Sequence, residues 1–367
     1  MNATVSRTST HPPASRKPRA SNKTTARKKL LMMILGIEST AHSLGIGVVR
    51  HDSGKVNARN TKVLSNAIAK VPSGRTGFIP RKLAEHHARK FKKTLGEALA
   101  QAGVNAAELD AIAYAQGPGL GHCLHVGFAA ANSLSLLLEK PLVPVNHTVA
   151  HVEVGKWACG MNDPLAVYVS GGNTQITALE GQLPSRHYRV YGETLDVGIG
   201  NFLDNAGRLL GVTPPDAVGI MKNAAQWKGS IIELPYSVKG VDLAFSGMLN
   251  AVRKAAERGG DKRQLCYSVQ ETSFAMLVEA TERCLCHTRK KQVLAVGGVA
   301  QNARLAEMLG LMCEDQRVSF AVVPPQYAGD NGAMIALTGL QEIVSNGVPQ
   351  DCRPDQNLRI DKTTVTW

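Results

Sequence analysis

Two kinds of feature are missing from this 367-residue sequence, and each absence excludes a class of protein. No apolar run reaches the ~20 residues that a helix needs to cross a bilayer, so we expect no membrane insertion. The seven cysteines are scattered, and Cys284 and Cys286 have no partner pair at zinc-ribbon spacing. Neither a disulfide framework nor a cysteine metal site is therefore indicated. These cysteines fit a reducing compartment, and we expect a cytoplasmic protein.

Acidic residues are absent before Glu38, although the same stretch carries eight arginines and lysines. It is rich in Ser, Thr, Pro and Ala and has no hydrophobic periodicity, so we expect residues 1–32 to be a disordered basic arm. Three interpretations remain open. The arm could add salt-sensitive affinity for nucleic acid, it could be an organelle transit peptide, or the true start could lie near Met32 or Met33. We favour an arm without essential chemistry.

The rest of the chain alternates short β-rich runs with helical patterns. Residues 34–49 and 166–179 each read as strand, turn of small and hydroxyl residues, strand. Between them lie a helix over 81–102 with a basic face, a strand over 110–115 and a helix over 126–138. Because the hairpin occurs twice, the sequence predicts a duplicated α/β architecture with a ligand bound between the halves. The alternation of strands and helices predicts βαβ units and a mainly parallel sheet.

A pair of histidines stands at the middle of the chain. His147 and His151 are four residues apart, a spacing that places both imidazoles on one face of a helix, where they can hold one metal ion. Asn146 is a good helix cap just upstream. A zinc peptidase needs a Glu directly after the first His, and that position is Thr148, so peptidase chemistry is excluded.

A third metal ligand has to come from elsewhere in the sequence, and Asp330 is the best candidate. It sits at a Gly-flanked turn before an apolar helical run, where its carboxylate could either cap the helix or face a cleft. Two imidazoles and one carboxylate would leave coordination positions open. Such a site suits a catalytic or substrate-binding metal better than a structural one.

Two Gly-rich turns could receive a nucleotide. In the second hairpin, Gly171 and Gly172 allow backbone to approach phosphate without side-chain obstruction. Gly297 and Gly298 join a strand to a helix, and Asn302 could donate to or accept from a base or sugar. The simpler interpretation is that both are tight turns and that Asn302 caps a helix.

Six strings of residues carry a resemblance to a known family. They are Leu35-Gly-Ile-Glu-Ser-Thr-Ala-His42, Asn146-His147-x-x-x-His151, Tyr168-Val-Ser-Gly-Gly-Asn-Thr174, Asn201-x-Leu-Asp204, Val296-Gly-Gly-Val-Ala-x-Asn302 and Asp330-Asn-Gly-Ala-Met334. In this order, the chain from Leu35 to about Gly347 resembles the tRNA threonylcarbamoyltransferase family. It looks closer to the archaeal and eukaryotic Kae1 branch than to the bacterial TsaD branch.

The resemblance implies an actin-like, sugar-kinase and Hsp70-type (ASKHA) fold with two related lobes and a ligand cleft between them. It implies transfer of the threonylcarbamoyl group from threonylcarbamoyl-adenylate to N6 of adenosine 37 in tRNAs that read ANN codons. It also implies a KEOPS-type complex with the Bud32 kinase, Cgi121 and Pcc1, the last docking on helices of the first lobe. We expect the lobes at 33–145 and 146–347 and a surface tail at 348–367.

The resemblance also implies site residues. His147, His151 and Asp330 would hold one divalent metal, Fe2+ or Zn2+. Tyr168 and Ser170 would be catalytic, because Tyr168 would approach the metal or the carbamoyl group. The other expected substrate-binding residues are Val169, Gly171, Gly172, Asp204, Gly219, Asn223 and Asn302.

One position departs from the family pattern. The family usually has a Glu four residues after the Gly that corresponds to Gly219, and this chain has Asn223. Asn can bond a hydroxyl but lacks the charge that strengthens such a bond. Two other functions stay open from the residues: an ATP-dependent carbamoyltransferase or kinase of the same fold, and a non-catalytic scaffold of a tRNA-modification complex.

Overall fold

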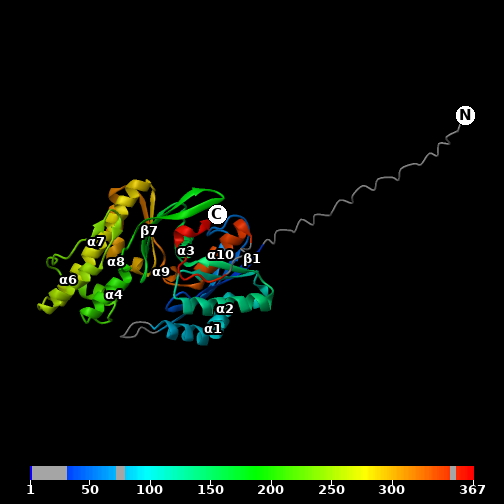
Figure 1. The fold of residues 1–367 in the computed structure, drawn as a ribbon, viewed down its shortest axis with the longest axis horizontal. Helices are drawn as coiled ribbons and strands as arrows, with labels where there is room; N and C mark the ends of the chain where they lie inside the picture. The colour runs from blue at the N-terminus through cyan, green and yellow to red at the C-terminus, as the bar shows by residue number, and fades with distance from the viewer. Residues whose placement is uncertain (2–30, 72–78, 348–352) are drawn as a thin grey trace. The chain divides into compact units, whose positions relative to one another are not determined.

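The computed structural model describes Met1 and residues 31–71, 79–347 and 353–367. The arm expected over 1–32 lies almost wholly outside these residues. Within them the fold is built on two sheets whose strands follow the same plan (Figure 1).

The first sheet has five strands in the order β3-β2-β1-β4-β5. They are β1 (Met32–Glu38), β2 (Ser43–His51), β3 (Thr61–Lys70), β4 (Ala111–Gly117) and β5 (Leu142–Asn146). β1, β2 and β3 pair antiparallel, whereas β1, β4 and β5 pair parallel. The tight turn between β1 and β2 permits only antiparallel pairing, and helical crossovers lead to the parallel strands.

The second sheet repeats this plan in the order β12-β11-β6-β7-β8-β13. Its strands are β6 (Leu165–Val169), β7 (Thr174–Gln182), β8 (Ser185–Glu193), β11 (Gln292–Val296), β12 (Ser319–Val322) and β13 (Thr364–Val365). β9 (Val238–Lys239) and β10 (Asp242–Leu243) form a separate pair. The predicted α/β class, both hairpins and the duplication are confirmed. The expectation of a mainly parallel sheet is wrong, because each sheet opens with antiparallel hairpins.

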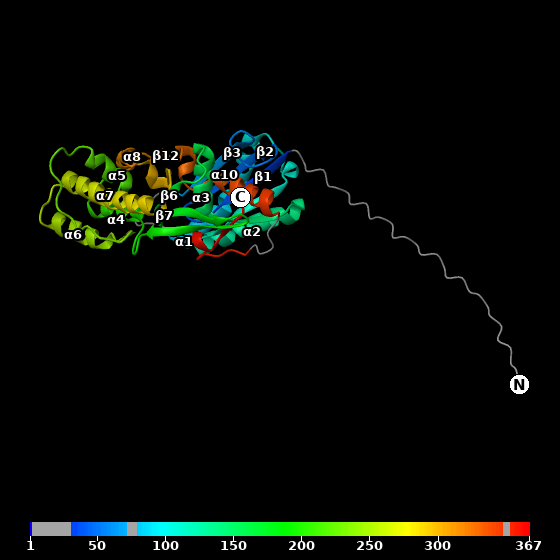
Figure 2. The same cartoon turned by 90° about the horizontal axis from the view of Figure 1, so that it is seen from above.

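Helices cover both faces of the first sheet (Figure 2). α1 (Pro80–Ala102) and α2 (Gly121–Leu138) pack on one face, where their apolar residues join Leu35, Ile46 and Tyr114 in one core. α10 (Gly332–Asn346) packs on the other face, and α3 (His147–Cys159) packs against α10. By length and composition alone α2 could span a membrane, and 22% of it is buried.

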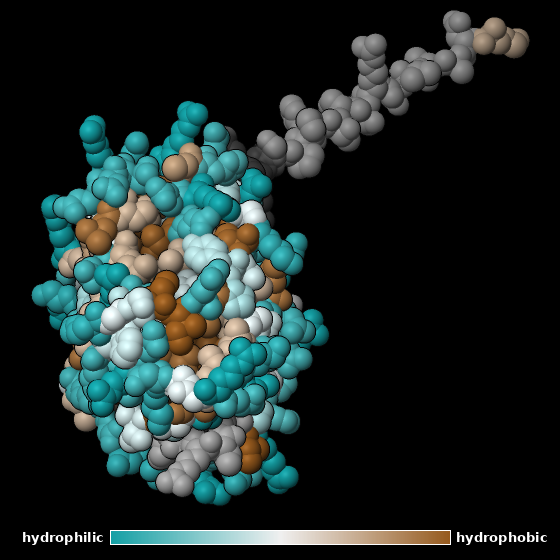
Figure 3. Space-filling view, turned by 90° about the vertical axis from the view of Figure 1, so that its left-hand side faces the viewer, coloured by the Kyte–Doolittle hydropathy of each residue, from teal (hydrophilic) through white to brown (hydrophobic). Residues whose placement is uncertain are grey.

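The second sheet is also covered on both faces. α3 and α9 (Pro325–Ala328) pack on one face with Tyr168, Leu294 and Val296. The larger core lies on the other face, among the remaining helices. These are α4 (Ile199–Leu209), α5 (Ala217–Ala224), α6 (Ser246–Glu257), α7 (Lys262–Thr288) and α8 (Ala303–Asp315). In Figure 3 this end of the molecule shows polar side chains around a few apolar ones.

α10 approaches the first sheet unusually closely because glycines line the contact. A Cβ on Gly332 would lie 2.2 Å from the backbone nitrogen of Gly47, and a Cβ on Gly36 would lie 2.2 Å from the backbone of α10. No larger side chain fits at either position. This packing fixes the start of the last helix against β1 and β2, and therefore fixes the turn that carries Asp330.

The described part of the predicted surface tail, 353–367, contains buried residues. Ile360 and Val365 are 2% and 0% exposed, and β13 pairs with β8. The side-chain amide of Asn146 donates to the carbonyl oxygen of Arg359 and to Thr363. This segment therefore packs against the start of α3 as well as against the second sheet. The expected lobe boundaries at 145 and 347 stay a prediction, although α10 belongs by its packing to the first sheet.

Candidate active site

α3 begins as the sequence predicts. The side chain of Asn146 accepts hydrogen bonds from the backbone nitrogens of Thr148 and Val149 and so caps the helix. His147 and His151 follow on one face, with ring centroids 4.6 Å apart. Both residues are buried, at 5% and 1% exposure. The predicted shared face of the two imidazoles is confirmed.

Asp330 meets these histidines from the far end of the sequence. Its Oδ1 lies 3.3 Å from Nε2 of His151 and 3.7 Å from Nε2 of His147. One ligand atom from each of the three side chains lies within 4.8 Å of the others. Ligands about 2.0–2.2 Å from a tetrahedral metal are separated by roughly 3.3 Å, so these distances suit a shared ion. Asn331, not Asp330, caps α10, which leaves the Asp330 carboxylate facing the histidines.

A fourth side chain, that of the buried residue Glu38, belongs to this cluster and was not predicted. Its Oε2 lies 2.8 Å from Nδ1 of His147, and its Oε1 accepts from both the backbone nitrogen and the hydroxyl of Thr40 at 2.6 Å. Glu38 is 0% exposed. The only sequence signal was an acidic residue at the end of an otherwise apolar strand, which an ordinary strand end also provides.

The charges in this cluster depend on one another. Burial would lower the pKa of His147, but the charge and hydrogen bond of Glu38 outweigh burial and raise that pKa to about 9. Burial lowers the pKa of His151, although the hydrogen bond to Asp330 opposes it. Burial would raise the pKa of Asp330, yet the two histidines hold it well below its usual range. Asp330 is therefore ionised at neutral pH and available as a ligand.

The residues present fit a metal ion. Two imidazoles and a carboxylate are a donor set used by Zn2+ and Fe2+, with positions left for substrate. Nδ1 of His151 is buried and has no hydrogen-bond partner among the described residues. Nε2 of the same ring faces Asp330, so Nε2 is the ligand atom and Nδ1 is left for a water molecule. The cluster can thus hold a metal, and its geometry does not select which one.

Tyr168, at the end of β6, lies beside this cluster. Its ring centroid is 5.1 Å from that of His151, and the side chain is 1% exposed. Burial and the nearby charge of Asp330 raise the pKa of Tyr168, while hydrogen bonds with Ser170 and Asn173 oppose the shift. The phenol is therefore protonated at neutral pH and can donate a hydrogen bond.

The Gly-rich turn after β6 packs on the start of α4. The backbone nitrogen of Gly200 donates to the carbonyl of Ser170, and that of Asn201 donates to the carbonyl of Gly171. A Cβ on Gly200 would lie 2.6 Å from the Ser170 oxygen. Gly171 and Gly172 are exposed. Backbone hydrogen bonds from the start of α4 thus hold the turn, and its two glycines are exposed to solvent, as a phosphate-binding turn requires.

Asp204, Gly219 and Asn223 come together on α4 and α5. Oδ1 of Asp204 accepts from the backbone nitrogen of Ala217, at the start of α5, and burial raises the pKa of Asp204. Asn223 donates its side-chain amide to the carbonyl of Gly219. The amide of Asn223 therefore stabilises its own helix, a use that the usual Glu could not make, because an ionised Glu does not donate.

Asn302 caps α8. Its Oδ1 accepts hydrogen bonds from the backbone nitrogens of Arg304 and Leu305. The interpretation of Asn302 as a helix cap is therefore confirmed for its side-chain oxygen. A Cβ on the preceding Gly297 would lie 2.2 Å from the carbonyl of Val169. This close approach brings the β11 turn beside the end of β6, next to Tyr168.

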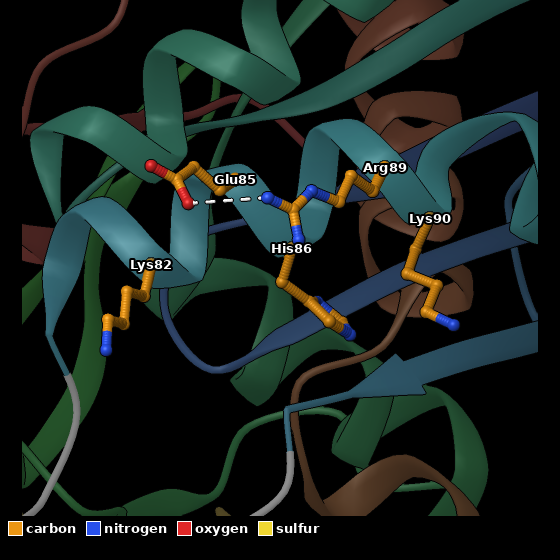
Figure 4. Close-up of a pocket in the computed structure, with 5 residues that line it drawn as sticks. All are labelled: Lys82, Glu85, His86, Arg89 and Lys90. Atoms are coloured by element: carbon orange, nitrogen blue, oxygen red, sulfur yellow. Dashed lines mark ion pairs between the residues drawn. The ribbon is translucent and has the colours of Figure 1, made fainter.

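α1 carries a basic face, and the opposite side of this helix contacts the same region. Nε2 of His87, on the buried side of α1, lies 2.9 Å from the carbonyl of Ala41, in the turn whose Thr40 hydroxyl lies 3.4 Å from His147. On the outer side, Lys82, His86 and Lys90 point the same way, while Arg89 pairs with Glu85 (Figure 4). The buried side of α1 therefore contacts the turn beside the metal ligands, and the basic residues that the sequence predicts lie on its exposed side.

Several curated proteins are similar to this chain over nearly its whole length. The tRNA N6-adenosine threonylcarbamoyltransferase of Thermococcus kodakarensis is 48% identical over 340 residues, which cover 92% of this chain and 100% of the relative. That of Methanopyrus kandleri is 44% identical over 92% of this chain and 96% of the relative. A probable bifunctional tRNA threonylcarbamoyladenosine biosynthesis protein of Methanocaldococcus jannaschii is 44% identical over 92% of this chain and 60% of its own length.

Solved structures show the fold. HypF of T. kodakarensis superposes with a TM-score of 0.58 at 15% identity, over 85% of this chain and 47% of HypF. The activator of the 2-hydroxyisocaproyl-CoA dehydratase from Clostridium difficile gives a TM-score of 0.50 at 12% identity, over 85% and 95% of the two chains. The mixed, duplicated sheets and these neighbours confirm the actin-like (ASKHA) fold.

The family itself follows from the match over most of the sequence. The model of the family described as TsaD, tRNA N6-adenosine threonylcarbamoyltransferase, matches residues 62–337. This range includes both histidines, the Gly-rich turn and Asp330. The chain belongs to the tRNA N6-adenosine threonylcarbamoyltransferase family.

Proposed function

We propose that this protein transfers the threonylcarbamoyl group from threonylcarbamoyl-adenylate to N6 of adenosine 37 in tRNAs that read ANN codons. In this reaction a bond forms between N6 and the carbamoyl carbon, the bond from that carbon to the phosphate oxygen breaks, AMP leaves with the electron pair, and N6 releases one proton. The observation that carries the proposal is the convergence of His147, His151 and Asp330 on one point from segments 179 residues apart.

We infer that these three residues hold one Fe2+ or Zn2+. A bound divalent ion supplies Lewis acidity, which polarises a carbonyl oxygen and stabilises the charge that develops there. The mixed anhydride is already activated, so the protein mainly has to position the donor and the weakly nucleophilic amine. Tyr168, held protonated beside His151, would donate a hydrogen bond to the carbamoyl group.

The donor would lie across the turns described above. Val169, Ser170, Gly171 and Gly172 would present backbone donors and a hydroxyl to the acyl phosphate, because the glycines leave the backbone open. Asp204, Gly219, Asn223 and Asn302 would hold the sugar and base. Since Asn223 brings no charge and already donates within α5, its bond to a ribose hydroxyl would be weaker than that of a Glu.

We infer that the phosphates of the tRNA run along the basic face of α1. This helix carries six arginines and lysines and two acidic residues, Glu85 and Glu97. They are Arg81, Lys82, Arg89, Lys90, Lys92 and Lys93. The contact from His87 to Ala41 ties α1 to the turn beside the metal ligands, so a tRNA that delivers its adenosine to the metal would pass over these cations.

We also infer a cytoplasmic complex with Bud32, Cgi121 and Pcc1. A partner of the Pcc1 kind would use the end of α2, where Leu136 and Leu137 are 72% and 77% exposed. The free cysteines of the described residues suit a reducing compartment.

Reconstitution tests the proposal against its two alternatives. The protein and its partners are incubated with threonine, bicarbonate, ATP, a threonylcarbamoyl-adenylate synthase and unmodified tRNA, and nucleosides are analysed by mass spectrometry. Modified adenosine that depends on the synthase supports the proposal. ATP turnover without modified adenosine would favour a carbamoyltransferase or kinase of the same fold. Modification that persists with the His151→Ala variant would favour a scaffold.

A further inference from the structure

We propose that Glu38 is the positioning residue of the metal site. It orients the imidazole of His147 and fixes which ring nitrogen faces the ion. This inference rests on the metal site of the proposed function. It concerns a residue that reaches the ion only through His147.

The contacts around Glu38 leave one arrangement for the ring. Oε2 of Glu38 lies 2.8 Å from Nδ1 of His147, and a buried carboxylate accepts but does not donate, so Nδ1 carries the proton. Nε2 is then the nitrogen that gives up its proton when a metal binds. Nε2 is the nitrogen on the Asp330 side, 3.7 Å from Oδ1 of that residue. Carboxylates commonly orient metal-ligating histidines in this way.

Glu38 is itself held in place. Oε1 accepts from the backbone nitrogen and the hydroxyl of Thr40, each at 2.6 Å. The carbonyl of Thr40 in turn accepts from the backbone nitrogen of Leu120, just before α2. A Cβ on Gly119 would lie 2.8 Å from Thr40. The carboxylate therefore has little freedom to rotate away from the imidazole.

The two histidines differ in whether a hydrogen bond fixes the orientation of the ring. His147 has a carboxylate on its second ring nitrogen, whereas Nδ1 of His151 has no partner among the described residues. The protein therefore fixes the orientation of one ligand by hydrogen bonding and leaves the other to packing against Tyr168. Removing Glu38 removes the hydrogen bond that fixes an imidazole ligand.

Metal affinity, measured without tRNA or adenylate, tests this role. Cobalt(II) is titrated into the metal-free protein and its visible absorption is recorded, for the wild type and for Glu38→Gln and Glu38→Ala. We expect Glu38→Ala to weaken binding about 10- to 100-fold and to change the cobalt spectrum. Glu38→Gln, whose amide oxygen can still accept from Nδ1, should lose less.

Glu153→Gln is the matched control. Glu153 is also a buried carboxylate, but it accepts its hydrogen bonds from Lys156, Tyr188 and Gln341 and none from a metal ligand. This variant should keep wild-type cobalt affinity and spectrum. Equal weakening by Glu153→Gln and Glu38→Gln would overturn the proposal, because the effect would then be general loosening of the core.

Thr40→Val covers the case in which Glu38→Ala does not fold. It removes the hydroxyl that holds Oε1 and should weaken cobalt binding less than Glu38→Gln. Unchanged affinity and spectrum in both Thr40→Val and Glu38→Gln would overturn the proposal. Failure of the proposed role of Glu38 can be distinguished from failure of the proposed function. If the wild-type protein modifies tRNA while these variants bind cobalt normally, only the role of Glu38 is refuted. If the wild-type protein does not modify tRNA while the variants bind cobalt weakly, only the proposed function is refuted.

Discussion

Asp330 and His151 are 179 positions apart in the sequence, and their Oδ1 and Nε2 atoms lie 3.3 Å apart in the structure. His151 stands on α3, next to the second sheet, whereas Asp330 precedes α10, which packs on the first sheet. Their meeting therefore depends on the packing of both halves of the molecule. A metal held there would link the two halves.

Substitution of either residue should remove both metal and activity. His151→Ala and Asp330→Ala each leave only two protein ligands, so we expect bound metal to fall below stoichiometric and modified adenosine to fall by more than about 100-fold, beyond the effect of outer-shell changes. Elemental analysis measures the bound metal, and nucleoside mass spectrometry measures the modified adenosine. The control is His287→Ala, an exposed histidine on α7, which should change neither. Full activity in Asp330→Ala would exclude it as a ligand.

The glycine contact under α10 should be sensitive to a single methyl group. Gly332→Ala places a Cβ 2.2 Å from the backbone of Gly47, and neither backbone can yield easily. We expect the free energy of unfolding to fall by about 1–3 kcal/mol, with a lower melting temperature and weaker metal binding.

Gly96→Ala is the control for that substitution. Gly96 lies inside α1 and a Cβ there would meet nothing within 4 Å, so alanine should stabilise the protein by about 0.5–1 kcal/mol. Equal melting temperatures for the two variants would contradict the packing described for α10.

Reversing charges on α1 should weaken tRNA binding and its salt dependence. If Lys82 and Lys90 each contact a phosphate, Lys82→Glu with Lys90→Glu should lower the slope of log affinity against log salt by roughly 1.5. The paired change Lys254→Glu with Arg258→Glu alters the same charge at the exposed end of α6, where Arg258 directly follows the helix, and should have less effect. Filter binding across salt concentrations measures the slopes, and identical slopes for both pairs would refute a specific role for α1.

The buried network around Glu153 should make stability depend on acid. Burial would raise the pKa of Glu153, but Lys156, Tyr188 and Gln341 outweigh burial and lower it from 4.5. The folded protein therefore favours the ionised form more than the unfolded chain does. The resulting stability is present above pH 4.5 and is lost as the pH falls below it.

Thermal unfolding from pH 7 to pH 3 measures this dependence. The Glu153→Gln variant should be less stable than the wild type at pH 7, and the difference should shrink as the pH falls below 4.5. A difference that is constant across this range would show that ionised Glu153 does not contribute through its charge.

Local patterns predicted much of the site. The cap at Asn146, the shared face of His147 and His151 and both hairpins depend on residues within a few positions of one another, and all are confirmed. Asp330 could be chosen as a candidate because it stands at a helix start. Its alternative as a cap was excluded only by the structure, in which Asn331 takes that role.

Long-range packing set the limit of prediction. The return of α10 to the first sheet and the burial of Ile360 and Val365 follow from contacts between distant segments, which no periodicity reveals. Glu38 was missed because its partner His147 is 109 positions away. The substrate roles of Asp204, Gly219, Asn223 and Asn302 stay predictions.

Metal titration of the wild-type protein tests the central claim most directly. The metal is removed by chelation until elemental analysis finds none, and Fe2+ or Zn2+ is then added in steps while modified adenosine is measured by mass spectrometry. We expect modification to be absent without metal and to reach its maximum at one ion per chain. Full modification of tRNA by the metal-free protein would contradict the account.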